Sequence, residues 1–284
     1  MDDLPRRWVV LLDIPSAVLD YLVPLFEERG LWPVVATVDD FRNATFSITC
    51  GHARATGWFV LPRRKESISL SAVAGSICGT LAATDNGQAV TPEGKFTYSE
   101  LTAFIGFIRQ FAGRALNPPR VGVPYTFCGS LPEQWESLRA GTRAMRVPHW
   151  QLATASNQPD RHEVIVRDIY DYRLRIENDP GAAECPVLLV ERPWGAFGSC
   201  AFVGDFQHHL IRDGDQVRSI APPPSLADAV HAVRTHYGLD FGEIAYSFSG
   251  EFVFWSIAPH LPIEHIEQPT FRPGLHALAD AMEE

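Results

Sequence analysis

Histidines are the side chains in this sequence with the clearest capacity for chemistry. His208 and His209 are adjacent, and His260 and His265 lie close together near the end of the chain, with Glu264 beside them. Imidazole nitrogens bind zinc and transfer protons near neutral pH. Successive strand residues point to opposite faces, so the adjacent pair is predicted to be two exposed hairpin histidines and not a metal pair. His260 and His265 match no known zinc spacing, and a zinc site completed by a third ligand is the weaker alternative.

Nucleophilic chemistry has less support in the sequence. There is no Gly-x-Ser-x-Gly segment, and the run Phe127-Cys128-Gly129-Ser130 lacks the strand-to-helix turn that exposes a catalytic serine. The cysteines are odd in number and include no Cys-x-x-Cys pair: they are Cys50, Cys78, Cys128, Cys185 and Cys200. This pattern is typical of thiols in a reducing compartment, so no disulfide framework is expected.

The charge balance excludes some classes of partner. The 284 residues include 24 Lys and Arg against 34 Asp and Glu, a formal net charge of −10. An acidic chain repels phosphate backbones, so we expect no nucleic-acid partner. The sequence opens with Met1-Asp2-Asp3, unlike a secretory signal, and it has no run of about 20 apolar residues that predicts a membrane helix. We therefore expect a cytoplasmic location and no membrane partner.

The elements that must position these residues divide the sequence in two. Residues 8–12 and 33–38 read as buried strands around a helix over 17–29 that Ser16 caps, which is a βαβ opening. Further strands are predicted at 44–50 and 57–61, and a helix ends near residue 113. Asn117-Pro118-Pro119 breaks the chain, so we place the main domain boundary between residues 116 and 117.

The second half alternates helices and hairpins. Helices are predicted over 132–144, over 226–237 with Ser225 as its cap and Gly238 as its end, and over 275–282. Strands are predicted at 163–168 and 186–190. Hairpins are predicted at 199–211, around Gly204-Asp205, and at 243–257, around Ser249-Gly250.

The order of these signals resembles an ATP-grasp domain. In that family a helix leads to Leu-x-Phe-Gly-x-Ile-Asp, a glycine turn follows, and a strand ends in Glu-x-Asn-Pro. This sequence has Leu239-Asp240-Phe241-Gly242-Glu243-Ile244-Ala245 and then Ser256-Ile257-Ala258-Pro259. Upstream, Pro186-Val187-Leu188-Leu189-Val190-Glu191 resembles the hinge strand that binds adenine, and Ala201-Phe202-Val203-Gly204-Asp205 resembles the strand and turn after it. The nearest likeness is to ribosomal-protein glutamate ligases and microviridin-type peptide cyclases.

The resemblance implies an α/β fold with two parts. Residues 1–116 would form a pre-ATP-grasp-like domain, and residues 117–284 an ATP-grasp-like domain whose central subdomain, about 146–190, is reduced. The family activates a carboxylate as an acyl phosphate, and its two magnesium ions need hard oxygen ligands. The positions that match the family's Asp, Glu and Asn are Ala245, Ser256 and Ala258, none of which is a carboxylate. Trp255, beside one of them, is interpreted as a core residue or as a side chain that fills the nucleotide cleft.

A few functional positions of the family could survive in altered form. Arg167 stands where the family has a phosphate-binding lysine, Arg218 matches a later arginine, and Val190 with Glu191 would hold adenine if ATP binds. If the closing strands align differently, Glu243 or Glu251 could supply the metal ligand. Glu243 is the better candidate because it lies two strand residues before Ala245, on the same face.

Three hypotheses follow from the resemblance. The first is a degenerate ATP-grasp protein with no metal site and no expected cofactor. It would bind a peptide or a small carboxylate in a peptide or natural-product modification pathway, with an active ATP-grasp homologue or a second copy of itself as a further partner. The second is an active carboxylate–amine or carboxylate–hydroxyl ligase that uses ATP and magnesium through Arg167, Arg218 and Glu243. The third is an enzyme that keeps the cleft for different chemistry.

Overall fold

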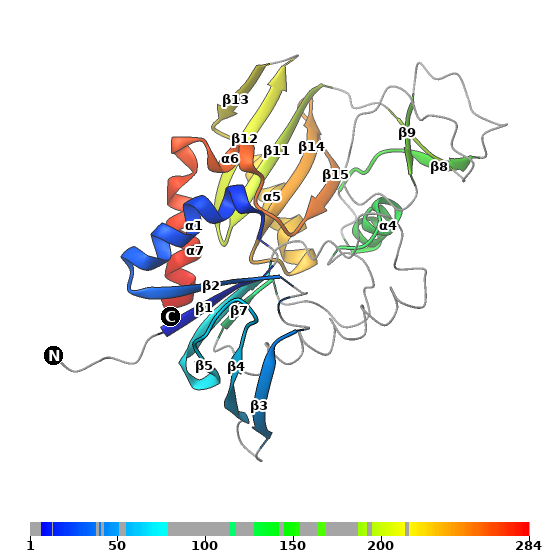
Figure 1. Cartoon of the computed structure of the whole chain (residues 1–284). Coiled ribbons are helices and arrows are strands. Elements are labelled where there is room, and N and C mark those ends of the chain that lie inside the picture. Colours follow the sequence, from blue (N-terminus) through cyan, green and yellow to red (C-terminus); the bar gives the residue numbers. More distant parts are fainter. Residues whose placement is uncertain are drawn as a thin grey trace. The chain divides into compact units, whose positions relative to one another are not determined.

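The computed structural model of the protein describes residues 7–12, 14–37, 40, 43–50, 55–78, 114–117, 128–141, 145–153, 164–168, 187–191, 195–213 and 216–283. The chain divides into two compact units (Figure 1). One unit joins Met1–Tyr125 with Ile266–Glu284, and the other is Thr126–His265. In the described part of the chain, no helix has the length and apolar character to cross a membrane.

The first unit is built on a parallel sheet of four strands in the order β2-β1-β6-β7. Its strands are β1 (Arg7–Leu12), β2 (Leu31–Ala36), β6 (Val73–Cys78) and β7 (Arg114–Leu116). The helix α1 (Ser16–Glu28) connects β1 to β2, and these strands pair in parallel. The βαβ opening predicted from the sequence is therefore confirmed, since parallel neighbours need such a crossover.

A second, antiparallel sheet of three strands belongs to the same unit. It consists of β3 (Thr45–Cys50), β4 (Ala55–Val60) and β5 (Ile68–Ser69), and the single helical turn η1 (Leu70–Ala72) follows it. Its inner side chains, among them Phe59 and Ile68, share one hydrophobic core with Trp8, Val10 and Leu12 of β1. The predicted helix that ends near residue 113 lies outside the described residues.

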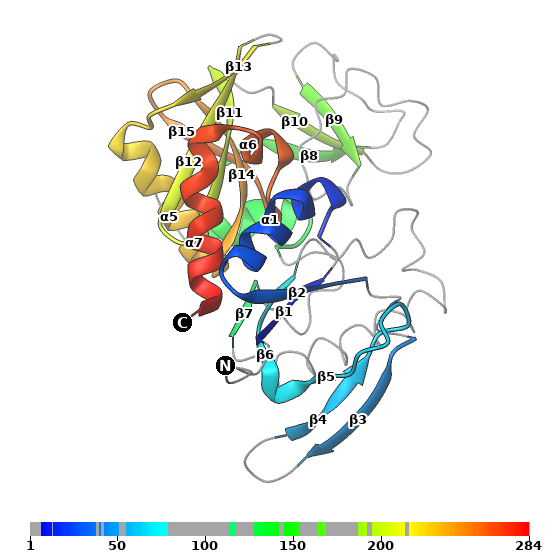
Figure 2. The ribbon, with the colours of Figure 1, turned by 60° about the vertical axis from the view of Figure 1, so that its left-hand side comes forward.

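The last helix, α7 (Arg272–Glu283), packs with the first unit and lies beside α1 (Figure 2). Met282 lies so close to Gly75 of β6 that a side chain at Gly75 would collide with it. Arg29, just after α1, bonds Asp280 and Glu283 of α7. The structure thus differs from the division expected at residue 116, which assigned this C-terminal helix to the second domain.

The second unit contains two antiparallel sheets. The smaller has the strand order β8-β10-β9 and consists of β8 (Trp150–Ala153), β10 (Val187–Glu191) and β9 (Val164–Asp168). The larger has the order β13-β12-β11-β14-β15, which Figure 1 shows. Its strands are β11 (Ala196–Val203), β12 (Phe206–Asp213), β13 (Gln216–Ile220), β14 (Phe241–Phe248) and β15 (Phe252–Ala258). Both predicted hairpins are present, and β13 was not predicted.

Three helices accompany these sheets: α4 (Leu131–Gly141), α5 (Pro224–Tyr237) and the short α6 (Ile263–Ile266). Ser16 was predicted as the N-cap of α1 and Ser225 as the N-cap of α5, and both predictions were wrong. The N-cap residues are Pro15 and Pro223, and neither makes a side-chain cap. In α5 the first helical residue is Pro224, and proline is favourable at that position since it lacks the N–H that a helix start leaves unpaired. Gly238 ends α5 in the left-handed conformation, with φ 59°, as predicted.

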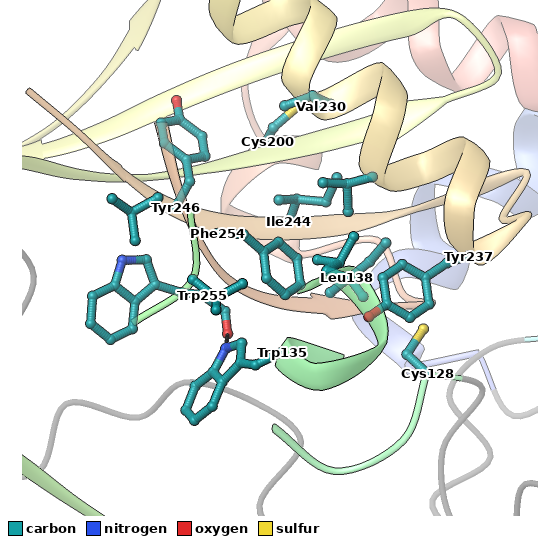
Figure 3. Close-up of a cluster of buried hydrophobic side chains, with 14 of the residues drawn as sticks. Cys128, Trp135, Leu138, Cys200, Val230, Tyr237, Ile244, Tyr246, Phe254 and Trp255 are labelled. Carbon is teal, nitrogen blue, oxygen red and sulfur yellow. Dashed lines mark hydrogen bonds between the residues drawn. The ribbon is translucent and has the colours of Figure 1, made fainter. Parts of the chain in front are cut away.

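One hydrophobic core joins α4, α5 and the larger sheet (Figure 3). It contains Leu138, Val230, Ile244, Phe254 and Trp255, all buried. Tyr237 stacks near Phe254, with ring centroids 6.4 Å apart. This core fixes the strands of the larger sheet, and with them the side chains on its other face.

Candidate functional site

The five-stranded sheet has two faces with different chemistry. Cross-strand partners lie on the same face, so the strand register assigns each side chain. His209, Cys200, Ile244 and Ile257 form one row across four strands. All four side chains are buried, and they include members of the core around α5. We call this side of the sheet the core face.

The neighbouring rows lie on the opposite side, which we call the site face. One row is His208, Ala201, Glu243 and Ala258, and the next is Leu210, Ser199, Ala245 and Ser256. The three positions matched to the family's metal ligands, Ala245, Ser256 and Ala258, are thus neighbours on one face. Glu243 lies among them and contributes the carboxylate of these two rows.

Glu243 is paired with a histidine from the segment that follows β15. His260 Nε2 lies 3.1 Å from Glu243 Oε2. This separation is within ion-pair distance. His260 Nδ1 is buried and has no hydrogen-bond partner. Glu243 is therefore held by an internal partner at the place where the second hypothesis needs it for a metal.

A chain of hydrogen bonds crosses the same face. Ser199 Oγ lies 2.7 Å from His265 Nε2, His265 Nδ1 lies 2.9 Å from His208 Nδ1, and His208 Nε2 lies 3.2 Å from Ser219 Oγ. The two imidazole rings are nearly perpendicular, with an interplanar angle of 79°. Both histidines are buried, whereas Ser199 is half-buried and Ser219 is exposed. The hydrogen-bonded chain thus runs from the surface at β13 to the site face beside Ala245.

Burial keeps both histidines of this hydrogen-bonded chain neutral. Desolvation lowers the pKa of His265 to about 4; the nearby Glu243 carboxylate opposes this change, and the other histidines reinforce it. Desolvation also lowers the pKa of His208. Near neutral pH each ring therefore carries one proton and one lone pair, which is what a chain of hydrogen bonds through both rings requires.

His209 lies on the core face and takes no part in this hydrogen-bonded chain. Its Nδ1 lies 3.1 Å from the Tyr246 hydroxyl, and its Nε2 lies 3.1 Å from Gln207 Oε1. The prediction that His208 and His209 are exposed was wrong, since they are 5% and 1% exposed. The prediction that they point to opposite faces is confirmed by the register. Both faces of β12 are covered, and the apolar residues Leu210 and Ile211 that follow were the signal for this.

The residues proposed for ligase chemistry are not brought together on one face. Arg218 pairs across the strands with Ile211, Ile211 pairs with Gly198, and Gly198 pairs with Tyr246. This row belongs to the core face, so Arg218 is on that side of the sheet. Glu243 is on the site face. Arg167 lies in β9 opposite Leu188, and its side chain is outside the described residues.

The predicted adenine hinge lies at the end of β10. Val190 is buried in the core, and Glu191 is half-buried. Arg146 Nη2 lies 3.7 Å from Glu191 Oε1, and Arg146 Nη1 lies 3.0 Å from Glu251 Oε2. Glu251 is exposed and is held at the β14–β15 turn by this arginine. It thus lies at the opposite end of the β14–β15 hairpin from Glu243, which pairs with Ala258.

Trp255 is a core residue whose backbone also holds α4. The register shifts at this point, from the pair Ala245 and Ser256 to the pair Tyr246 and Phe254, so Trp255 is the extra residue of a bulge. Its indole N–H donates to Ser247 Oγ at 3.0 Å, and its carbonyl accepts a bond from Trp135 Nε1 at 2.8 Å. Trp255 is buried, as a core residue would be, and its indole lies against Ser247 and Phe197, which are on the site-face side of β14 and β11. The interpretation that it fills a nucleotide cleft stays a prediction.

The site face does not fit a magnesium ion. Magnesium needs several oxygen ligands in a near-octahedral arrangement. Methyl groups stand at Ala245 and Ala258, and Glu243 is paired with His260. In the described part of the chain, no three His, Cys, Asp or Glu residues are placed to hold a metal ion, so the zinc alternative for His260 and His265 has no support there.

No protein-family model matches the sequence, and no curated protein matches it in sequence. Solved structures do match the fold. The macrocyclase MdnC of Microcystis aeruginosa, bound with precursor peptide MdnA, aligns with a TM-score of 0.70 at 14% identity, over 97% of this chain and 99% of that chain. An ATP-grasp ligase of Chryseobacterium gregarium, associated with RiPPs and in complex with ADP, a leader and a core peptide, aligns with a TM-score of 0.71 at 12% identity, over 97% and 96%.

A RimK domain ATP-grasp protein of Sphaerobacter thermophilus also aligns, with a TM-score of 0.56 at 13% identity, over 98% of this chain and 100% of that chain. At such identities the likeness establishes the fold. The chain has the α/β ATP-grasp fold over nearly its whole length, as the resemblance implied, and the macrocyclase MdnC is among the proteins that share it.

Proposed function

We propose that this ATP-grasp chain binds a peptide, or a small carboxylate, without magnesium-dependent ligation. One observation carries the proposal: the site face presents Ala245, Ser256 and Ala258 together, and the neighbouring Glu243 is paired with His260. Phosphoryl transfer depends on metal ions and cations that neutralise the phosphates. Methyl groups and one hydroxyl cannot supply that charge.

The peptide part of the proposal rests on the structural neighbours. MdnC and the Chryseobacterium gregarium ligase share this fold, and both were solved with peptides bound. We transfer peptide binding to this chain as a proposal. A cytoplasmic location, a partnership with an active homologue and self-association stay predictions.

Thermal unfolding with and without ATP and magnesium tests the nucleotide part. A ligand at 100 times its dissociation constant adds about 2.7 kcal/mol to the free energy of unfolding, which is readily measured. We expect no magnesium-dependent shift. The competing ligase hypothesis predicts a shift that Glu243→Ala abolishes. Glu251→Ala is the matched control, because it removes an exposed carboxylate from the same hairpin.

Fluorescence anisotropy tests the peptide part. The probes are synthetic peptides whose genes neighbour the gene of this chain, labelled at one end. We expect saturable binding that ATP and magnesium leave unchanged. Binding that requires ATP would support the ligase, and no binding by any of these peptides would remove the peptide proposal and leave the small carboxylate.

A further inference from the structure

The hydrogen-bonded chain on the site face has the arrangement of an activated nucleophile. Serine attacks carbonyl groups when a base within about 2.6–3.2 Å takes its proton and a third group orients that base. Ser199 Oγ and His265 Nε2 are 2.7 Å apart, and His265 Nδ1 and His208 Nδ1 are 2.9 Å apart. Both separations fall in that range.

We propose that Ser199 is a nucleophile for acyl transfer, with His265 as its general base and His208 as the residue that positions the base. The substrate class is an activated acyl group, namely an ester or thioester of a peptide or small carboxylate. This proposal goes beyond the proposed function and needs neither nucleotide nor metal.

The proton positions are consistent with these roles. For Ser199 to donate to His265 Nε2, His265 must carry its own proton on Nδ1 and donate it to His208 Nδ1. His208 then carries its proton on Nε2 and donates it to Ser219 Oγ, 3.2 Å away. The three distances allow the hydrogen bonds to run in either direction, and this direction is the one in which His265 Nε2 can take the proton of Ser199.

The surroundings favour attack at Ser199 over Ser219. Ser199 is half-buried and pairs across the strands with Ala245, whose side chain is a single methyl group. Ser219 lies on the edge strand β13 and is exposed to water. His265 is buried, so water competes little for its Nε2.

The reaction balances without a further reagent. Ser199 Oγ attacks the carbonyl carbon while its proton moves to His265 Nε2. The bond from that carbon to the leaving oxygen or sulfur then breaks, and the leaving group takes the proton from His265. An amine or water attacks the acyl-serine in the reverse sequence, and Ser199 Oγ recovers a proton through His265.

Labelling with a fluorophosphonate probe tests the proposal on the full chain. The serine displaces fluoride from phosphorus, so the product has a defined mass and peptide mapping locates it. We expect the label on Ser199, none in Ser199→Ala, and a rate at least about 100-fold lower in His265→Gln, the size of effect typical of general-base catalysis. Ser137→Ala is the matched control, since it removes a serine that also lies 2.9 Å from a histidine nitrogen, His236 Nε2, but outside this site, and its labelling rate should stay within about threefold.

Two further variants separate a positioning role from a structural one. Asparagine places an amide atom near the Nδ1 position of histidine, so His208→Asn should retain most of the labelling rate and His208→Leu should lose most of it. If His265→Gln does not fold, Ser199→Cys gives a second reading: its thiol should react with iodoacetamide at least about tenfold faster than glutathione at the same pH.

The proposal is overturned if no label appears, if it appears on another residue, or if Ser199 is labelled equally fast in His265→Gln. It is also overturned if the thiol of Ser199→Cys reacts no faster than glutathione. These results are independent of nucleotide binding, so they leave the proposed function standing.

Discussion

The two faces of the five-stranded sheet differ although their residues alternate along the same strands. On β14, Ile244 packs in the core around α5, while its neighbours Glu243 and Ala245 lie on the other side. The core face is mostly apolar, although His209 with its two hydrogen-bond partners and Arg218 lie on that side. The site face carries serines, histidines and a carboxylate. The fold therefore constrains one face, and the chemistry of the other can change without loss of the scaffold.

Acid should affect both faces, and it is the largest change that we predict. Burial lowers the pKa of His209 on the core face and of His265 on the site face from 6.5 to about 4. Between these pH values the unfolded chain binds more protons than the folded one. The stability is therefore complete above pH 6.5 and is lost as the pH falls toward 4. At about 1.36 kcal/mol per pKa unit, each histidine contributes at most about 3 kcal/mol.

Urea unfolding followed by tryptophan fluorescence at several pH values between 7.5 and 4 measures this loss. His209→Asn should remove the part of this pH-dependent loss of stability that comes from the core face. His265→Gln should remove the part that comes from the site face. A free energy of unfolding that stays constant from pH 6.5 to 4.5 would show that neither ring is buried in its neutral form.

A matched pair of substitutions on β14 sharpens the comparison of the faces. Ile244→Ala leaves a cavity in the core, and such a deletion lowers the free energy of unfolding by about 2–5 kcal/mol. Ala245→Ser, one residue further on the site face, adds a hydroxyl beside Ser199 and should change it by less than about 1 kcal/mol. Chemical denaturation of both variants is the measurement. Equal losses would mean that the site face is packed as tightly as the core face.

Much of this scaffold could be predicted from the sequence, because its signals are local. Turns and helix ends depend on few residues, and several were predicted correctly: the turns at Gly204-Asp205 and Ser249-Gly250 and the end of α5 at Gly238. The strand β13 was missed because most of its side chains are exposed and show no alternation. The place of α7 was missed because its contact with β6 joins residues far apart in the sequence.

The site was less accessible to sequence analysis than the fold. The proximity of Ala245, Ser256 and Ala258 was implied by the family's order of motifs, and the register places them side by side. The bond between Ser199 and His265 joins residues 66 positions apart and has no motif. The histidines on β12 were predicted to be exposed, although the apolar Leu210 and Ile211 directly after them indicate that both faces of this strand are covered.

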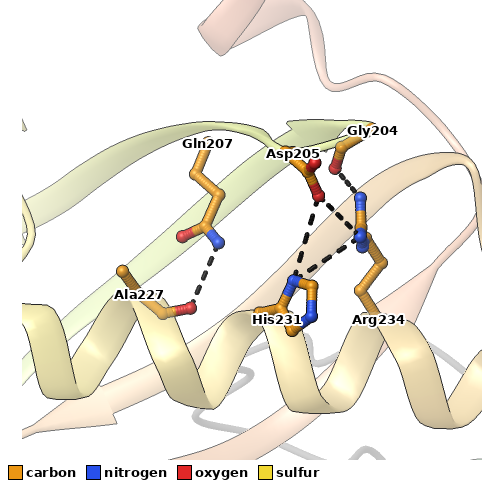
Figure 4. Close-up of polar contacts among 6 residues, drawn as sticks. All are labelled: Gly204, Asp205, Gln207, Ala227, His231 and Arg234. Carbon is orange, nitrogen blue, oxygen red and sulfur yellow. Dashed lines mark hydrogen bonds and ion pairs between the residues drawn. The ribbon is translucent and has the colours of Figure 1, made fainter.

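The smallest effect that we predict concerns how α5 is held to the sheet (Figure 4). Arg234 of α5 bonds the Gly204 carbonyl and lies 2.9 Å from Asp205 Oδ1 at the β11–β12 turn. The Asp205 side chain is 88% exposed, and exposed ion pairs contribute about 0–1 kcal/mol. Asp205→Asn should therefore cost less than about 0.5 kcal/mol, whereas Arg234→Ala also leaves the carbonyl without its bond and should cost about 1 kcal/mol. Denaturation at low and high salt separates the two contributions, since only the ion pair is screened. If Asp205→Asn cost as much as Arg234→Ala, the ion pair and not the bond to the carbonyl would hold this end of the core face.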